Sequence, residues 1–156
     1  MSKMQIEDII NHIRNRSYMS GVERDRARVK ATGEVFTPTS LVIEVLEQMP
    51  IEQFQDPTKT FLDNSCGDGQ FLGEVLIRKM ENGSTFEQAL QTVYGVDMME
   101  DNVALCRERL LCGRTDLAHI VERNIVCHDA LTYDYSFNGT NMNQDDLRFE
   151  QLFSFQ

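Results

Sequence analysis

The chain has 156 residues, of which 41% are hydrophobic and 26% are charged, so it is long enough and apolar enough for one folded domain with its own core. This composition excludes a disordered tail, and no run approaches the roughly eighteen apolar residues of a membrane span. Because the first residues also lack the apolar core of a signal peptide, we expect a cytoplasmic protein without membrane contact.

The net charge of −10 is unevenly distributed along the chain. Residues 1–31 carry seven Lys and Arg against four Asp and Glu (+3), which leaves eight against twenty-one (−13) for the remainder. An acidic body disfavours nucleic acid, because duplex affinity depends on neutralised phosphates, so only the basic N-terminal arm offers such a contact. A solvated arm explains the same charges. We divide the chain into an N-terminal helix and basic arm at 1–31 and a second domain at 32–156.

The N-terminal part of the chain predicts two amphipathic helices. Four isoleucines share one face of a helix over residues 4–14, which covers the domain or meets a partner. A second helix opens at Pro38, with Thr37 or Thr39 at its start, and Pro50 ends it. Its apolar face includes Leu41, Val42, Val45, Leu46 and Met49.

Alternating strands and helices follow. Residues 60–62 predict a first strand, and after a glycine-containing turn comes a helix that buries Phe71, Leu72, Val75, Leu76 and Met80 before Asn82-Gly83 ends it. Ser84 and Glu87 have the spacing of a capping box and predict a short helix to Leu90 or Gln91.

The second half repeats this order. Residues 92–96 predict a second strand, 100–112 a helix that Gly113 closes, and 124–127 a third strand. Residues 149–155 alternate as a fourth strand does. Strands that alternate with helices indicate parallel βαβ units and an α/β fold.

Two glycines after the first strand indicate a ligand-binding turn. Gly67 and Gly69 allow positive φ angles and a close ligand approach, and the helix that follows offers unpaired N–H groups. Asp63 stands at the carboxyl end of its strand, where open α/β sheets bind ligands. The turn does not match the dinucleotide fingerprint, because Leu72 stands where a third glycine is required.

The cysteines and histidines do not indicate a metal site. The chain has four cysteines, Cys66, Cys106, Cys112 and Cys127, without a C-x-x-C pair, and its three histidines do not complete a ligand spacing with them. We expect four reduced thiols and no bound metal.

Four motifs in fixed order carry a family resemblance. They are 33–38 (GEVFTP), the strand, turn and helix of 61–72 (FLDNSCGDGQFL), 94–97 (YGVD) and 124–131 (NIVCHDAL). Over about residues 32–131 they resemble the S-adenosylmethionine-binding half of the N6-adenine DNA methyltransferases. The resemblance implies S-adenosylmethionine as cofactor and a Rossmann-like class I methyltransferase fold, with a parallel sheet truncated to three or four strands and flanked by helices.

The first two motifs are expected to hold the amino-acid end of the cofactor. By resemblance, the segment that closes over its methionine part comprises Phe36, Thr37 and Pro38. The strand, turn and helix that receive its amino and carboxylate groups contribute Asp63, Cys66, Gly67 and Gly69. A plain helix start explains Thr37 and Pro38 equally well, and a tight turn without ligand is the alternative for the glycines.

The last two motifs are expected to hold the nucleoside. By resemblance, Asp97 accepts both ribose hydroxyls and Met98 packs on the adenine face, although a strand-end aspartate also serves as a helix cap, a task that Asp101 or Asn102 can share. Asp129 accepts a hydrogen bond from the adenine amino group, with Ala130 and Leu131 beside the ring. A turn aspartate is the alternative for Asp129.

The catalytic part of the family pattern is missing. Amino-group methyltransferases hold the flipped base with an Asn/Asp-Pro-Pro-aromatic loop, whereas the three prolines here are Pro38, Pro50 and Pro57. The half-sized sheet also leaves an apolar strand edge unpaired, so we expect a homodimer or a complex with a larger methyltransferase subunit.

The sequence leaves three functions open. The first is a methyltransferase that acts on adenine in nucleic acid, in which Asn138 or Asn141 and Phe137 or Tyr135 replace the missing loop. Alternatively it is a non-catalytic cofactor-binding module, such as a sensor, decoy or regulatory subunit. A third possibility is an enzyme that degrades S-adenosylmethionine, as defence-evading viral proteins do, since the chain resembles short phage-encoded proteins.

Overall fold

Three short parallel strands form the centre of the computed structural model, which describes residues 5–15 and 37–138. The strands are β1 (Phe61–Asp63), β2 (Val93–Asp97) and β3 (Ile125–Cys127), in the order β1-β2-β3. Leu62 pairs with Tyr94, and Val96 pairs with Val126. The α/β class and the truncated parallel sheet are therefore confirmed.

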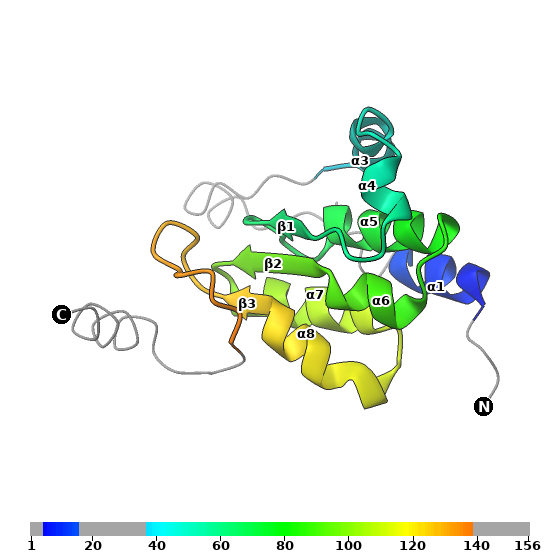
Figure 1. Ribbon diagram of the computed structural model, residues 1–156. Helices are drawn as coiled ribbons and strands as arrows, with labels where there is room; N and C mark the ends of the chain where they lie inside the picture. The colour runs from blue at the N-terminus through cyan, green and yellow to red at the C-terminus, as the bar shows by residue number, and fades with distance from the viewer. Residues whose placement is uncertain (1–4, 16–36, 139–156) are drawn as a thin grey trace.

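Helices connect and flank the strands (Figure 1). They are α1 (Ile6–Ile13), α3 (Thr39–Glu47), α4 (Glu52–Gln55), α5 (Gln70–Glu81), α6 (Phe86–Gln91), α7 (Glu100–Leu111) and α8 (Ala118–Asn124), with a 3-10 turn at Thr115–Leu117. Helices α5 and α7 lie behind the sheet in the view of Figure 1, and α1 packs against both of them. This arrangement puts the loops that leave the carboxyl ends of the strands at the side of the molecule away from α6.

The main core lies between the sheet and α5 and α7. Successive residues of a strand point to opposite faces, and Val93 and Ile125 point to the helices and are fully buried. Gly95 lies on the same face, where a Cβ atom would come within 2.9 Å of Cys66 and Leu72. A glycine is therefore required for the turn after β1 to pack this closely on β2.

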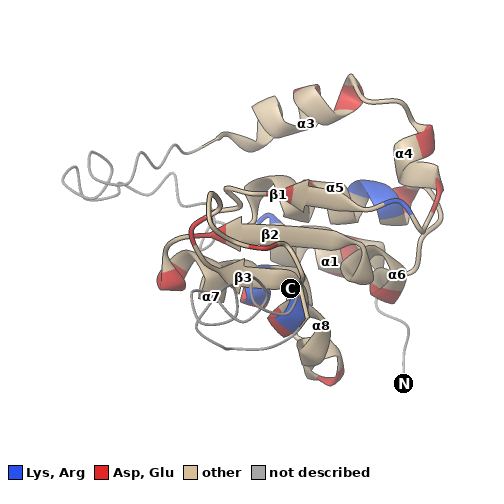
Figure 2. Cartoon of the chain, turned by 60° about the vertical axis from the view of Figure 1, so that its left-hand side comes forward, with Lys and Arg blue, Asp and Glu red and all other residues tan. Residues whose placement is uncertain are grey.

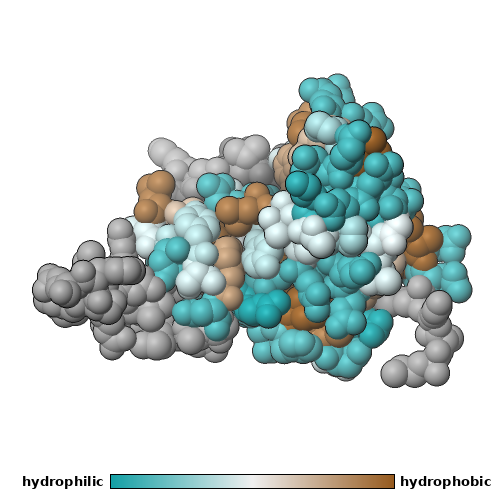
Figure 3. Space-filling model, viewed as in Figure 1, coloured by the Kyte–Doolittle hydropathy of each residue, from teal (hydrophilic) through white to brown (hydrophobic). Residues whose placement is uncertain are grey.

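The opposite face of the sheet carries Leu62, Tyr94 and Val96 and has a different cover. The ring of Phe137, in the loop after β3, contacts the ring of Tyr94 with centroids 4.9 Å apart. Val96 is fully buried, whereas Leu62 on the edge strand is 53% exposed. Among the described residues β1 pairs with β2 alone, so its outer edge is open. Figure 3 shows hydrophobic atoms at the surface over α3 and near β1.

Most predicted elements agree with the structure to within a residue or two at each end. The second helix buries a narrower stripe than expected, because Val42 and Leu46 are buried but Leu41 and Val45 are 46% and 40% exposed. Phe71 and Met80, which we placed among the core residues, are only partly buried. In the part of the chain that the structure describes, no helix has the length and apolar character to cross a membrane.

The capping box lies one residue later than the sequence spacing suggested. Thr85 is the N-cap of α6, and its hydroxyl accepts from the amide of Gln88, whose side chain accepts from the Thr85 amide. The expected pair, Ser84 and Glu87, was wrong because the Ser84 amide closes the end of α5 by donating to the Lys79 carbonyl. Helices α4 and α8 were not predicted. The expected fourth strand, the segment 16–36 with Gly33 and Phe36, and Asn141 lie outside the described residues.

Candidate functional site

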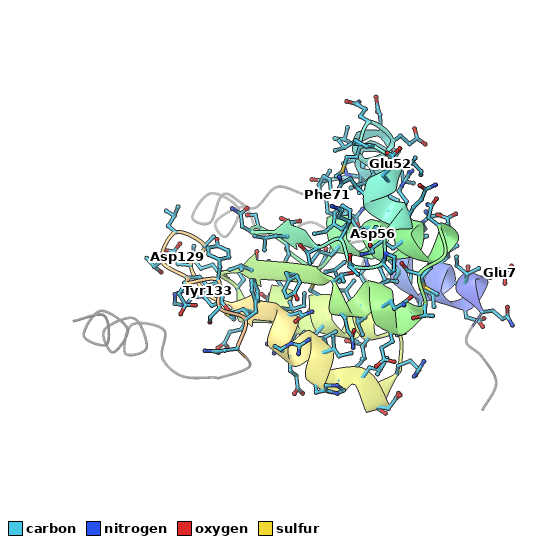
Figure 4. All side chains as sticks on the ribbon, viewed as in Figure 1. Glu7, Glu52, Asp56, Phe71, Asp129 and Tyr133 are labelled. Carbon is cyan, nitrogen blue, oxygen red and sulfur yellow. The ribbon has the colours of Figure 1, made fainter. Side chains whose placement is uncertain are left out.

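Three aspartates follow the carboxyl ends of the three strands. Asp63 and Asp97 are the last residues of β1 and β2, and Asp129 comes two residues after β3. Because the strands are parallel, these ends lie at one edge of the sheet, the edge that binds ligands in open α/β folds. Figure 4 shows Asp129 in the loop beyond this edge, and Figure 2 shows acidic residues here and where α7 begins. The edge is therefore a region of negative charge.

The glycine turn lies beside these carboxylates. Gly67 and Gly69 have φ angles of 53° and 94°, in the left-handed region that favours glycine. The amide of Cys66 donates to the carbonyl of Val96 at 3.0 Å, which fixes the turn on the end of β2. A Cβ atom on Gly67 would meet nothing within 4 Å, so that side of the turn is open. A ligand can approach the backbone there without meeting a side chain of the described residues.

Asp97 connects the turn to the start of α7. One carboxylate oxygen accepts from the Gly67 amide at 3.3 Å, and the other accepts from the Met99 amide and from the side chain of Asn102, both at 3.0 Å. Met99, and not Asp97, is the N-cap of α7. A carboxylate has about four acceptor positions, of which three are occupied. In the part of the chain that the structure describes, one acceptor position therefore remains for a further donor, and the long Gly67 contact is the weakest of the three that are made.

The ionised form of the Asp63 carboxylate is disfavoured by burial. Burial, with a smaller contribution from the nearby charge of Asp97, raises its pKa above 3.8, although the Ser65 amide, which donates to it at 3.0 Å, acts in the opposite direction. Burial penalises the ionised form, and a cation beside the carboxylate would restore it. The amino-acid end of S-adenosylmethionine carries such a cation.

The loop after β3 contacts the end of β2. The amide of His128 donates to the carbonyl of Asp97 at 2.9 Å, and Asp129 accepts from the amide of Leu131 with one side-chain oxygen at 2.9 Å. Met98 is 59% exposed, and the Cys127 thiol donates to its carbonyl at 3.5 Å. The structure thus brings the third and fourth motifs together. Ala130 is partly buried in the same loop.

The first motif is described only at its end. Thr37 is partly buried, and exposed Pro38 is the N-cap of α3, where its carbonyl accepts from the amides of Leu41 and Val42. This geometry is that of a helix start. Phe36, expected beside them, lies outside the described residues.

The thiols at the site are not activated. A hydrogen bond with Cys106, together with burial, raises the pKa of Cys66, so its thiol stays protonated at neutral pH. All four cysteines are free. Within residues 5–15 and 37–138, no group of three His, Cys, Asp or Glu side chains is arranged to hold a metal ion.

The aromatic residues proposed to replace the missing loop form a cluster among themselves. Tyr133 lies between Tyr135 and Phe137, with ring centroids 5.1 and 5.2 Å away, and the Tyr135 hydroxyl donates to the carbonyl of Ala130 at 2.7 Å. Tyr135 and Phe137 have positive φ angles of 55° and 44°, which are strained for such residues. In this structure the ring of Phe137 covers the sheet.

Sequence reasoning missed one residue of the site region, Arg109 of α7. Its guanidinium group is 1% exposed and lies against Asp68 and Gln70, in and just after the glycine turn. The signal was its place on the core face of the helix, three residues after Cys106 and next to Leu110, because a charged residue on such a face requires buried partners.

Comparison with known proteins gives one match. The model of a family described as N-6 DNA Methylase matches residues 23–147, which is most of the chain and includes all four motifs. No curated protein and no solved structure matches significantly.

Proposed function

Because the chain belongs to the N-6 DNA methylase family, we propose that it binds S-adenosylmethionine at the carboxyl edge of its sheet. One observation carries the proposal: the glycine turn after β1 is held by the carboxylate at the end of β2, through the contact between Gly67 and Asp97. This contact joins the two motifs that the family uses for the opposite ends of the cofactor.

The chemistry of the residues present fits this ligand. Asp63 would take the ammonium group and backbone amides of the turn the carboxylate, while Asp97 would take the ribose and the exposed side chain of Met98 would lie against the adenine. Asp129 is an acceptor for the adenine amino group, once it exchanges its contact with the Leu131 amide or uses its other oxygen. A negative sheet edge also attracts a sulfonium cation. When bound, the cofactor supplies a methyl group activated for transfer to an amine.

These 156 residues lack the loop with which the family holds its target base. The three prolines of the sequence all precede β1, so no Asn/Asp-Pro-Pro-aromatic loop follows the sheet within these 156 residues. We therefore propose binding without transfer by these 156 residues alone, as a cofactor-binding subunit or decoy, and an adenine methyltransferase activity only where a loop from outside them completes the site. The open edge of β1 and exposed Leu62 are where a second copy or a larger subunit would pair.

Calorimetry of the purified chain with S-adenosylmethionine, and with its demethylated product, tests the proposal. We expect dissociation constants on the order of micromolar. The absence of heat at millimolar ligand would remove the binding proposal and with it both derived functions. Incubation with labelled cofactor and an adenine-containing duplex separates transfer from binding. Product analysis without duplex detects cofactor degradation.

A further inference from the structure

Arg109 is the charged residue of the described chain that lies deepest beside the proposed site. It projects from the last turn of α7, and its guanidinium group is 1% exposed. One ion-pair contact, at 3.5 Å, joins it to Asp68, which stands between the two glycines of the turn and is itself buried. A buried charge is retained only where its partners are well placed, so this group constrains whatever it touches.

The same guanidinium group links two further segments. Its Nε donates to the carbonyl of Ile13, the last residue of α1, at 2.6 Å, and one Nη donates to the side chain of Gln70 at 2.9 Å. Gln70 in turn donates to the hydroxyl of Thr39, the first residue of α3, at 2.8 Å. A continuous series of hydrogen bonds thus runs from the end of α1, through Arg109 and Gln70, to the start of α3.

This series connects both segments that the family resemblance assigns to the amino-acid end of the cofactor. Thr37 and Pro38 directly precede Thr39, while Asp68 and Gln70 belong to the turn and the helix start. On its other side the turn is fixed by the contact between Gly67 and Asp97. The turn is therefore held between a carboxylate of β2 and a guanidinium group of α7.

Helix α1 packs against α5, the helix that begins directly after the glycine turn. Ile9 and Ile13 are fully buried, and a Cβ atom on Gly73 of α5 would lie 2.6 Å from the Ile13 side chain. Arg14 forms a two-point ion pair with Glu74, at 2.7 and 3.0 Å. The docked helix therefore presents the Ile13 carbonyl to Arg109 at a fixed place.

We propose that Arg109 is a positioning residue, which holds the glycine turn and the start of α3 in the geometry that receives the amino-acid end of the ligand, with docked α1 orienting its guanidinium group. The inference rests on the proposed function. Its consequence is that α1, far from the nucleoside motifs, contributes to ligand affinity. By thermodynamic linkage the ligand must then protect docked α1 to the same extent.

The test compares full-length variants with a matched control. Arg109→Met removes every donor, Arg109→Lys keeps the charge, and Asp68→Asn weakens the contact with the turn from the other side. Arg14→Met is the control, because it breaks an ion pair of α1 without touching the turn, while Ile9 and Ile13 keep the helix docked. Calorimetry with S-adenosylmethionine, well below each variant's Tm, measures affinity. Hydrogen exchange measures the exchange rates of the backbone amides in the turn and in α1, with and without ligand.

We expect Arg109→Met to bind about five- to hundredfold more weakly than wild type, within the usual range of coupling between sites. Asp68→Asn should weaken binding in the same direction, Arg109→Lys should restore part of the loss, and Arg14→Met should stay within about twofold. In wild type, ligand should slow exchange of the α1 amides, and Arg109→Met should lose most of this protection. Unchanged affinity in folded Arg109→Met or Asp68→Asn overturns the inference, as does an equal loss in Arg14→Met.

A second readout needs no ligand and keeps the inference separate from the proposed function. Loss of Arg109 should speed amide exchange at Gly69 and at the start of α5 more than in α6, whereas Arg14→Met should not. If wild type binds no S-adenosylmethionine but the turn shows this response, the proposed ligand is wrong and the positioning role stands. If the turn amides do not respond, the positioning role is wrong whatever the ligand.

Discussion

The backbone amide of Gly67 donates to the side-chain carboxylate of Asp97 at 3.3 Å, a contact that joins residues thirty positions apart in the chain. It crosses from the loop after β1 to the end of β2, so the two motifs on which the proposed function depends form one structure. Because it is the longest of the three hydrogen bonds that the Asp97 carboxylate accepts, it is the one most readily replaced when a hydroxyl group competes for the same oxygen.

Replacement of Asp97 by Asn should weaken both the fold and the proposed ligand site. The substitution removes the charge and one acceptor oxygen, so at least one of the donors from Gly67, Met99 and Asn102 is left unpaired. We expect a loss of about 1–3 kcal/mol in the free energy of unfolding, measured by urea denaturation, and a loss of at least about tenfold in cofactor affinity. Asp116→Asn, in an exposed ion pair with Arg114, is the control and should change neither.

Two glycines should respond to alanine in different ways. At Gly67 the new methyl group meets no atom of residues 5–15 or 37–138 within 4 Å, so the cost is the left-handed backbone, about 1–2 kcal/mol. At Gly95 it would lie 2.9 Å from Cys66 and Leu72, and overpacking typically costs about 1–3 kcal/mol.

Ligand binding tests whether the open side of the turn is the ligand side. We expect Gly67→Ala to lose affinity by more than its stability loss explains, because its methyl group stands where the ligand approaches the backbone. Gly95→Ala should lower the Tm and also weaken binding, because its methyl group presses on Cys66 and displaces the turn, which faster amide exchange of the turn would report. Equal affinities for wild type and Gly67→Ala would show that the open side of the turn is not the ligand side.

The raised pKa of Asp63 predicts a pH dependence with a definite sign. Because the pKa in the folded chain lies above the unfolded value of 3.8, the folded state binds the proton more tightly, and this contribution to stability is complete below pH 3.8. It is lost as the pH rises through the folded pKa. At neutral pH Asp63→Asn should therefore be more stable than wild type, with the difference disappearing in acid. Thermal unfolding of both proteins between pH 3 and pH 8 measures this difference.

A cationic ligand should reverse the effect. With S-adenosylmethionine bound, wild type should gain more stability at neutral pH than Asp63→Asn does, because the ammonium group would stabilise the ionised carboxylate. The affinity of wild type should fall as the pH drops through the folded pKa of Asp63, while that of Asp63→Asn should change less. An equal ligand-induced rise in Tm for both proteins at pH 7 would remove Asp63 from the site.

The strands and the two main helices could be predicted because their signals are local. Apolar runs end at Asp63 and Asp97, glycines mark the turn, and α5 and α7 each continue for 12 residues with apolar residues at helical spacing, although polar residues share their buried faces. Helices α4 and α8, with 4 and 7 residues, are too short for such a period to be read. The capping box lies one residue later than predicted because Ser84 and Thr85 both carry the required hydroxyl. Only the end of α5, which uses the Ser84 amide, decides between them.

The places of Asp63 and Asp97 at strand ends could be predicted from the sequence, but the contacts between the candidate site residues could not. The contacts of Arg109 with Asp68 and with Ile13 span 41 and 96 positions, and no spacing rule indicates such pairs. The aromatic loop after β3 shows the same limit of prediction from sequence. Tyr135 and Phe137 were considered as base-stacking residues by type, and their involvement with Tyr94 and Tyr133 appears only in three dimensions.

Substitution of Phe137 decides whether the aromatic loop covers the sheet or binds a base. If the ring is structural, as its contacts with Tyr94 and Tyr133 indicate, Phe137→Ala should lower the free energy of unfolding by about 1–3 kcal/mol and change the near-ultraviolet circular dichroism of the tyrosines. Tyr135→Phe is the matched control, since it loses only the hydrogen bond to the Ala130 carbonyl and should cost about 1 kcal/mol or less. A base-stacking ring predicts the opposite pattern for Phe137→Ala, namely unchanged stability together with loss of any methyl transfer that wild type shows.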